Sequence, residues 1–362
     1  PGTSEMHLVA AIDHNPAVRP VLGLFEGVVS GAADGYARMS GKSAANLLHL
    51  GPGLGNAFAN IHNAKKACSP MINIVGDHAS YHLKHNAPLT SDLDGLAKSS
   101  SDWVKRVSSP EQITQCANDA WKAANQAPGN IATLIVPADY AWSDIGSDLP
   151  KKVELTNRKP VDNKLIEAAY KLLLKPNSML YLGGKFLDEE CLKFAAQIAT
   201  KTGCRLVTDT FVSRIRRGAG LPIVQQVPYF SEMAEDFLQG TESIVFIGTK
   251  PPVSFFAYPD KKSFLSPDEA ELFELCSVEE NRYEALALLS ELSGSPKIAN
   301  ELIRPHISDV PTSGDLDVTT LGPLIADMMP EESIVSDESA TSSLIVTPHA
   351  LQAKPHDWLA LT

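Results

Sequence analysis

The sequence predicts an α/β protein with a complete parallel-sheet domain, a second, Rossmann-like α/β domain and the beginning of a third α/β domain. Short apolar runs alternate with helical patterns along most of the 362 residues, which is typical of parallel sheets covered by helices. Polar, proline-containing stretches at 143–161 and 296–316 interrupt the alternation and predict linkers. A composition of 44% hydrophobic and 20% charged residues favours a globular protein with buried cores.

The first domain is expected to span residues 1–145. Its buried strands are predicted at 20–25, 44–50, 70–77 and 131–139. The helical patterns between them lie at 26–39, 55–67 and 110–126. Ligands of such sheets bind at the carboxyl ends of the strands, where Glu26, His49 and the stretch 76–78 all fall. We therefore expect a binding site at that edge of the sheet.

The second domain is expected at 160–297 and the third from 317 to 362. The strands predicted for the second domain are 178–184, 204–209, 243–248 and 270–276, and a helix is expected at 188–201. The third domain begins with the helical pattern LGPLIADMM and a strand at 333–339. Because the chain opens with Pro1 and ends in the apolar run PHDWLALT, we interpret it as a fragment cut at both ends.

Charge and cysteine content narrow the functional class. A net charge of −12 and a pI of about 5.3 argue against nucleic acid or a membrane surface as a partner and fit a protein that handles small molecules. The five cysteines form no CxxC pair, which favours a reducing compartment, and we expect a cytoplasmic protein. No apolar run reaches transmembrane length.

Glu26 is a single carboxylate between an apolar run and a helix of small residues. It can be a helix N-terminal acid favoured by the helix dipole. Alternatively, flanking Leu24, Phe25, Val28 and Val29 bury it, and a carboxyl in an apolar pocket can take part in proton transfer near neutral pH. The small residues that follow would let another group pack close to this helix.

The stretch HLGPGLGN, 49–56, predicts a tight turn between a strand and a helix. Its G-x-G-x-G spacing differs from the dinucleotide fingerprint, so a simple turn and a backbone approached by a ligand ring are both open. His49 at the strand end is either structural or suited to proton transfer.

Several other polar clusters have a structural and a functional interpretation. His78, His82 and His85 favour a surface loop over a metal site, because no acidic ligand lies between them. The stretch YLGGKF, 181–186, forms either a simple tight turn or a turn that binds phosphate. The arginines of 214–217 are either solvated or bind phosphate. The hydroxyls of 337–343 either cap a helix or hold a phosphate.

Taken together, these motifs resemble a known family. PGTSEMHLVAAI, FEGVVSGAADGYARMSGK, LHLGPGLGNAFANIHNAKKACSPMINIVGDH and PLTSD are similar to the pyrimidine-binding domain of thiamine-diphosphate-dependent enzymes. Within that family the chain resembles acetolactate synthase large subunits, with benzoylformate decarboxylase nearby. The second unit resembles the family's central domain, and VSDESATS and PHDWLALT resemble the opening of its diphosphate-binding domain.

The resemblance implies roles for individual residues. Glu26 matches the catalytic glutamate that bonds the cofactor's aminopyrimidine and assists ylide formation, after which the ylide attacks a 2-oxo acid and CO2 leaves. Thr3 and His49 match residues that line the substrate pocket. The residues that match the loop beside the pyrimidine are Gly51, Pro52, Gly53 and Asn56. The residues expected near the diphosphate are Ser339, Thr341 and Ser342.

The same resemblance implies thiamine diphosphate and Mg2+ as cofactors. The family's metal-binding motif would lie beyond Thr362, so no metal ligands are expected in this chain, which by itself is expected to be inactive. FAD is possible, but the sequence shows no convincing flavin site. The resemblance also implies a homodimer or homotetramer, because the family's active sites form between subunits.

The leading functional hypothesis is a carboligase or decarboxylase of small 2-oxo acids such as pyruvate. The alternatives are a non-catalytic scaffold or regulatory relative, a benzoylformate decarboxylase-like lyase and a nicotinamide or flavin oxidoreductase. The stretch 251–259, PPVSFFAYP, lacks the second pocket histidine of benzoylformate decarboxylase. Absence of G-x-G-x-x-G followed by an acidic residue disfavours the oxidoreductase.

Overall fold

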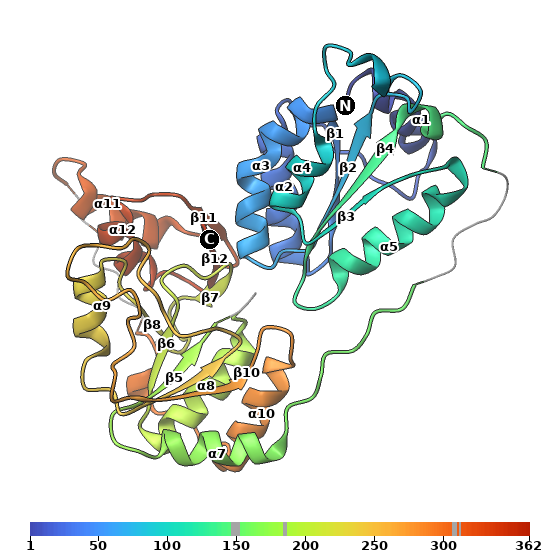
Figure 1. Ribbon diagram of the computed structural model, residues 1–362. Helices are drawn as coiled ribbons and strands as arrows, with labels where there is room; N and C mark the ends of the chain where they lie inside the picture. The colour runs from blue at the N-terminus through green and yellow to red at the C-terminus, as the bar shows by residue number, and fades with distance from the viewer. Residues whose placement is uncertain (146–152, 184–186, 306–309, 311–312) are drawn as a thin grey trace. The chain divides into compact units, whose positions relative to one another are not determined.

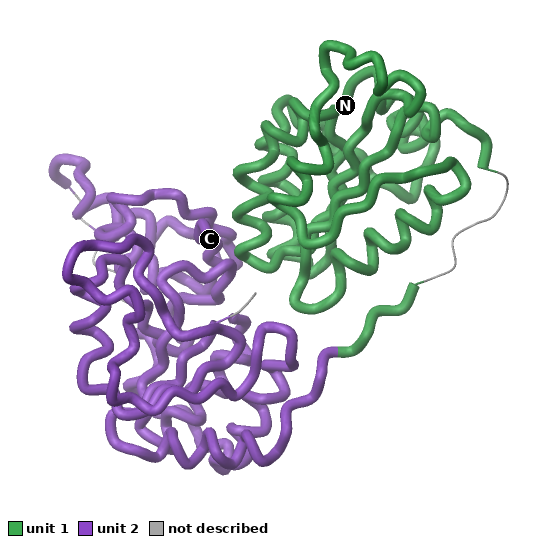
Figure 2. The backbone as a smooth tube through the Cα atoms, in the orientation of Figure 1, with its two compact units in different colours: residues 1–157 green, residues 158–362 purple. Residues whose placement is uncertain are grey.

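The computed structural model of the chain describes residues 1–145, 153–183, 187–305, 310 and 313–362. The chain forms two compact units, residues 1–157 and 158–362 (Figure 2). Within the described residues, no helix combines the length and the apolar character that a membrane span requires. All five cysteines carry free thiols.

The first unit is built on a four-stranded sheet in the order β1-β2-β4-β3, and every neighbouring pair is parallel (Figure 1). The strands are β1 (Ala44–His49), β2 (Met71–Asp77), β3 (Trp103–Arg106) and β4 (Ile131–Pro137). The helices are α1 (Met6–His14), α2 (Glu26–Ser40), α3 (Leu50–Lys66), α4 (Leu93–Ser100), α5 (Ile113–Asn125) and α6 (Ala138–Ala141).

Helices cover both faces of this sheet, as the side-chain alternation of β4 shows. Ile131 and Ile135 belong to a core that includes side chains of α2, α3 and α4. Leu134 and Val136 point to the opposite face and pack in a second core with α5. Because successive side chains of a strand point to opposite faces, a strand that is buried along its whole length must have helices on both sides.

One predicted strand is wrong. Residues 20–25 form no strand, and their apolar side chains lie in solvent: Leu24 is 95% exposed. An apolar run predicts burial but does not say what buries it, and the described residues supply no sheet neighbour for 20–25. The expected turn after residue 49 is also different, because α3 already begins at Leu50 and the glycines lie in its first two turns. Strand β3 was not predicted, since its Lys105 and Arg106 break the apolar pattern.

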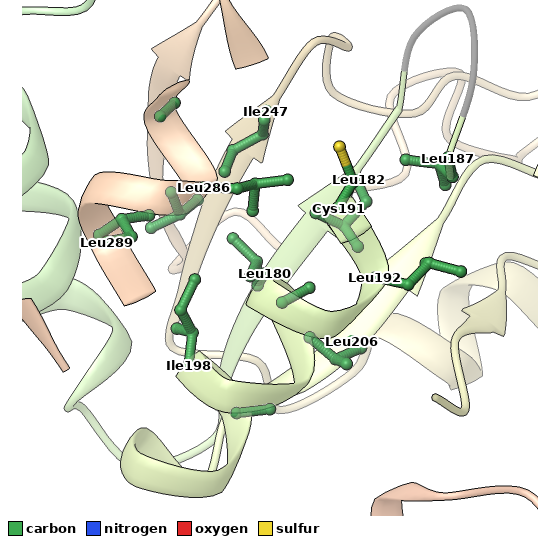
Figure 3. Close-up of a cluster of buried hydrophobic side chains, with 14 of the residues drawn as sticks. Leu180, Leu182, Leu187, Cys191, Leu192, Ile198, Leu206, Ile247, Leu286 and Leu289 are labelled. Atoms are coloured by element: carbon green, nitrogen blue, oxygen red, sulfur yellow. The ribbon is translucent and has the colours of Figure 1, made fainter. Parts of the chain in front are cut away.

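The second unit contains a five-stranded parallel sheet in the order β10-β9-β5-β6-β8. The strands are β5 (Ser178–Leu182), β6 (Arg205–Thr208), β8 (Gln225–Gln226), β9 (Ser243–Ile247) and β10 (Glu271–Cys276). The helices are α7 (Asn163–Leu173), α8 (Glu189–Thr202), α9 (Ser231–Leu238) and α10 (Arg282–Leu292). Leu180 and Leu182 of β5 pack with α8 and α10 on one face (Figure 3), while Met179 and Tyr181 face α9 on the other.

The last part of the chain completes a second, smaller sheet in the same unit. Its order is β11-β12-β7, formed by β7 (Ile215–Arg217), β11 (Ile334–Asp337) and β12 (His356–Ala360). Strand β7 from the middle of the chain pairs antiparallel with β12, whereas β11 pairs parallel with β12. Helices α11 (Val318–Met328) and α12 (Ser343–Ala350) accompany this sheet.

The arginines of 214–217 stabilise this sheet, so the expectation of solvated or phosphate-binding arginines is wrong. Arg214 Nε donates to Asp357 Oδ1 at 2.9 Å, and Arg216 Nη1 lies 3.5 Å from Asp357 Oδ2. Arg216 also pairs with Glu332. The Arg217 guanidinium is buried over the ring of Trp358, 4.8 Å from its centroid. The side chains therefore tie β7 to β12 rather than facing a ligand.

Asp357→Ala is expected to lower the free energy of unfolding by about 1–3 kcal/mol, because it removes the carboxylate that Arg214 and Arg216 share in a largely desolvated position, although Arg216 keeps Glu332. Urea denaturation measures this. Asp236→Ala on the exposed face of α9 is the control and should change stability by less than about 0.5 kcal/mol. Equal effects of the two substitutions would show that the ion pairs do not hold the sheet.

A buried carboxyl predicts a pH dependence of stability. Burial raises the pKa of Asp209 to about 6, while the hydroxyl of Thr249 opposes this by donating to its Oδ2 at 2.9 Å. The folded-state pKa lies above the ordinary value of 3.8, so the folded protein binds this proton more tightly. The resulting stabilisation is complete below about pH 4 and is lost as the pH rises through about 6.

Asp209→Asn should therefore gain stability relative to the wild type as the pH rises from about 4 to about 7. Two pKa units set an upper limit of about 3 kcal/mol, and partial contact of Asp209 with solvent reduces the expected gain to about 1–2 kcal/mol. Thermal or urea denaturation at both ends of this range measures it. A difference between variant and wild type that did not change with pH would refute the assignment.

Candidate cofactor and catalytic site

Small residues let helices α2 and α3 approach closely in the first unit. Gly27, Ser30 and Ala57 are buried between them. Ser30 Oγ lies 3.3 Å from the carbonyl oxygen of Ala57, and Asn60 Nδ2 donates to the carbonyl oxygen of Gly27 at 2.6 Å. These contacts hold the first turn of α2 against the middle of α3. Because Glu26 is the first residue of α2, its position relative to α3 is set by the same contacts.

The Glu26 carboxylate is hydrogen-bonded through one oxygen, and a glycine lies beside the other. Asn56 Nδ2 donates to Glu26 Oε2 at 3.1 Å. A Cβ at Gly53 would lie 3.6 Å from Glu26 Oε1 and only 3.3 Å from the carbonyl carbon of Leu48. Glycine at 53 thus leaves room beside Oε1. The structure brings together three of the predicted cofactor-contacting residues, Glu26, Gly53 and Asn56.

The expected apolar burial of Glu26 is wrong for this chain. Leu24 is 95% exposed and Val28 is 60% exposed, and Glu26 itself is only partly buried. These apolar side chains lie on an open segment and on the outer face of α2, where no described part of the first unit covers them. The carboxylate is therefore positioned by Asn56 and by the helix contact, and not by an apolar pocket of its own unit.

A sharp change of backbone direction places His49 beside this group. His49 is the last residue of β1, and Leu50, which follows it, starts α3 with a φ of +48°. A left-handed conformation at a leucine costs of order 1–3 kcal/mol, and it is retained here because the Leu50 side chain is buried in the core. The turn puts the His49 Cβ 3.5 Å from the position that a Cβ at Gly53 would take.

Glu5 is the site residue that the sequence did not reveal. Its side chain is fully buried, and its Oε2 lies 2.7 Å from His49 Nδ1. The backbone N–H of Gly2 donates to the same oxygen at 2.6 Å. The local sequence hint was a carboxylate one residue before the apolar helix α1, and the partner lies 44 residues away along the chain.

The remaining predicted site residues make no hydrogen bond to Glu26 or His49 among the contacts of the described residues. Thr3 is exposed in a short 3-10 helix, Thr3–Glu5, and Pro52 is exposed in the first turn of α3. Gly51 is buried against Ser91: a Cβ at Gly51 would lie 2.0 Å from Ser91 Oγ. Three hydroxyl residues belong to the second unit, between β11 and α12: Ser339, Thr341 and Ser342. Ser339 Oγ donates to Asp337 Oδ1 at 2.6 Å.

Two further stretches singled out in the sequence lie within the described residues, and a third lies partly outside them. The rings of His78, His82 and His85 follow one another at centroid distances of 5.5 and 5.7 Å. No three His, Cys, Asp or Glu side chains of the described part of the chain are arranged to share a metal ion. The stretch PPVSFFAYP contributes Phe255, Phe256 and Tyr258 to an aromatic hollow of about 270 Å³ in the second unit. Of YLGGKF, residues 184–186 lie outside the described residues.

Known proteins match this chain over its length. Residues 1–97 match the N-terminal TPP binding domain of thiamine pyrophosphate enzymes. The IlvX protein of Mycobacterium tuberculosis, named after acetolactate synthase large subunits, is 42% identical over all 362 residues, which cover 69% of that protein. The acetolactate synthase large subunit of Corynebacterium glutamicum is 25% identical over 320 residues, covering 83% of this chain and 50% of that protein.

Solved structures agree on the fold. Benzoylformate decarboxylase from Polynucleobacter necessarius superposes with a TM-score of 0.81 at 21% identity, covering 99% of this chain and 70% of that one. The 4-hydroxybenzoylformate decarboxylase of Rhodococcus jostii gives a TM-score of 0.78 at 19% identity, covering 100% of this chain and 71% of that one. The chain belongs to the family of thiamine-diphosphate-dependent enzymes, and its relatives include acetolactate synthase large subunits.

Gly76→Ala tests how tightly Glu5 is held. A Cβ at Gly76 would lie 1.8 Å from Glu5 Oε1, and both residues are buried, so we expect a loss of about 1–3 kcal/mol in the free energy of unfolding. Gly55→Ala in α3 is the matched control. Its Cβ would meet nothing within 4 Å, and a gain of about 0.5–1 kcal/mol is expected from the helix propensity. Urea denaturation that ranked the two variants in the opposite order would contradict this packing.

Proposed function

We propose that the protein is a thiamine-diphosphate-dependent carboligase or decarboxylase of a small 2-oxo acid, similar to acetolactate synthase. The observation that carries the proposal is the group formed by Glu26, Asn56 and Gly53. It supplies a carboxylate with one oxygen bound by Asn56 and the other beside a glycine. The 42% identity to IlvX supports the same class.

The residues present fit the aminopyrimidine end of the cofactor. Asn56 engages Glu26 Oε2, which leaves Oε1 to bond a ring nitrogen. Gly53 keeps the neighbouring space open, since a Cβ at that position would lie 3.6 Å from Oε1. Thiamine diphosphate, when bound, supplies the nucleophilic carbon and the electron sink that decarboxylation of a 2-oxo acid requires.

The protein's own residues then have separate tasks. Glu26 would exchange a proton with a nitrogen of the cofactor's pyrimidine ring, and Asn56 keeps the carboxylate from rotating away. The His49 side chain, one quarter exposed at the neighbouring strand end, hydrogen-bonds an oxygen of the substrate. Thr3 contributes its hydroxyl from the adjoining turn. Gly51 and Pro52 shape the first turn of α3 beside the ring.

We propose three hydroxyl residues of the second unit as contacts for the diphosphate of the cofactor. Ser339, Thr341 and Ser342 are placed between a strand end and a helix, where hydroxyls can contact a diphosphate. Mg2+ is part of the proposal, and no group of three His, Cys, Asp or Glu side chains among the described residues is arranged to hold it. FAD has no support among the described residues, and we do not include it.

The exposed apolar segment around Glu26 supports a homo-oligomer. Val21, Leu22, Leu24 and Val28 are all more than half exposed next to the proposed site. A second copy of the chain would remove these side chains from water and give Glu26 the apolar surroundings that its own unit does not provide. A cytoplasmic location remains our expectation from the free cysteines.

A benzoylformate decarboxylase-like lyase is the second candidate. His49 and the structural similarity to benzoylformate decarboxylase favour it. The stretch PPVSFFAYP offers no histidine. Release of CO2 from benzoylformate in preference to pyruvate would decide for the lyase, and formation of acetolactate from pyruvate would decide for the carboligase.

The first experiment is a calorimetric titration of thiamine diphosphate with Mg2+ into the full-length protein. Saturable binding that requires Mg2+ supports the proposed enzyme, after which pyruvate and benzoylformate are tested for CO2 release. A folded, oligomeric protein that binds no cofactor would support the alternative of a non-catalytic scaffold or regulatory relative.

Glu26→Gln is expected to lower kcat at least about 100-fold, because the amide cannot exchange the proton. The fold and the denaturation midpoint should be unchanged, since the amide oxygen of the variant side chain can still accept from Asn56. Glu111→Gln, at an exposed carboxylate of the same unit, is the control and should keep full activity. Near-wild-type turnover by Glu26→Gln would refute the role of Glu26.

A further inference from the structure

We propose that Glu5 is a positioning residue that holds His49 in the tautomer protonated on Nδ1, so that Nε2 is the nitrogen that exchanges a proton with the substrate. The inference rests on the proposed function for its catalytic part. Its structural part, the protonation pattern of His49, does not depend on any cofactor.

The contact between Glu5 and His49 is short, and it is made through one oxygen of a buried carboxylate. Oε2 of the fully buried Glu5 lies 2.7 Å from His49 Nδ1. An ionised carboxylate can only accept hydrogen bonds, so beside an ionised Glu5 a contact of this length places the proton on Nδ1. The Gly2 N–H donates to the same oxygen at 2.6 Å, which is consistent with an oxygen that accepts from two donors.

The surroundings prevent the pair from rearranging. A Cβ at Gly2 would lie 2.6–2.8 Å from three atoms of the His49 ring, so the backbone of Gly2 packs directly on the imidazole. On the other side, Gly76 packs against Glu5 Oε1, which has no hydrogen-bond partner in the described structure. The carboxylate can neither turn away nor find another donor among the described residues. The ring is therefore held in one orientation.

This arrangement has a chemical consequence for His49. With Nδ1 donating to a carboxylate, Nε2 carries the lone pair in the neutral ring and the exchangeable proton in the cationic ring. The partly exposed His49 ring lies beside Gly53, which also borders Glu26.

The direct test is nuclear magnetic resonance of the protein with 15N-labelled histidine, without cofactor. The His49 resonances are assigned by their absence in His49→Asn. We expect Nδ1 to show the shift of a protonated nitrogen and Nε2 that of an unprotonated one at pH values where the ring is neutral. A wild-type His49 protonated on Nε2 would overturn the proposal, whatever the variants do.

Glu5→Met removes the acceptor at nearly constant volume. We expect His49 to shift toward the tautomer protonated on Nε2, which free imidazole side chains prefer. Glu5→Gln is the matched variant, because its amide oxygen can still accept from Nδ1 and should preserve much of the wild-type tautomer. An unchanged tautomer in a folded Glu5→Met protein would contradict the positioning role.

The kinetic test uses the full-length protein with thiamine diphosphate and Mg2+. Glu5→Met should lower kcat about 10–100-fold, by analogy with the loss of the partner that orients a metal-binding histidine. In a His49→Asn background the same substitution should have little further effect, because Glu5 acts through His49. Additive losses would show that Glu5 acts otherwise. A wild type that binds no cofactor would instead refute the proposed function while the tautomer result stands.

Discussion

The close packing of α2 against α3 is the constraint on which the candidate site depends. Glu26 lies at the start of one helix and Asn56 within the other, so the distance between these helices sets the distance between the two side chains. Ser30 and Asn60 fix that distance by contacts to backbone carbonyl groups of the opposite helix. Each such hydrogen bond contributes only about 1 kcal/mol, and their main effect is to select one relative position of the helices. A larger side chain at the fully buried Ala57 would separate the carboxylate from its amide partner.

The second unit depends on a similar long-range constraint. Strand β7 and strand β12 are far apart in the chain, 141 residues between the paired Arg216 and Asp357, yet Arg214 and Arg216 of the one region meet Asp357 of the other. Bringing such distant segments together carries a loop-closure cost that grows only slowly with length, and buried ion pairs help to specify the pairing. The sheet of β11 and β12 is thereby built onto the unit that contains the larger parallel sheet.

Local sequence patterns predicted most of the architecture, because buried parallel strands and amphipathic helices leave strong signals. The strands β1, β2 and β4 of the first unit, and β5, β6, β9 and β10 of the second, lie where the apolar runs indicated. The segment 20–25 was mispredicted, since an apolar run has the same composition whether its own sheet or a different surface covers it. The composition of a run carries no information about its partner.

The candidate site was predictable to the extent that its residues are close in sequence to recognisable turns. Glu26 and the glycines of the stretch 49–56 stand at strand and helix ends, and the structure places Glu26 beside Gly53 and Asn56. Glu5 was not predictable, because a carboxylate near a helix start has many ordinary explanations and its histidine partner is 44 residues away. Likewise, clustered arginines at 214–217 look the same in sequence whether they bind a ligand or a distant aspartate.

The contact between Gly2 and Glu5 has a practical consequence for anyone who handles this protein. The backbone N–H of residue 2 and the carboxylate of residue 5 together support the imidazole of His49, so this short segment is part of the site. Substitution or removal of these residues would act at the same place as a mutation of His49 itself. Differences in activity between preparations that differ there would then reflect the histidine and not the quality of folding.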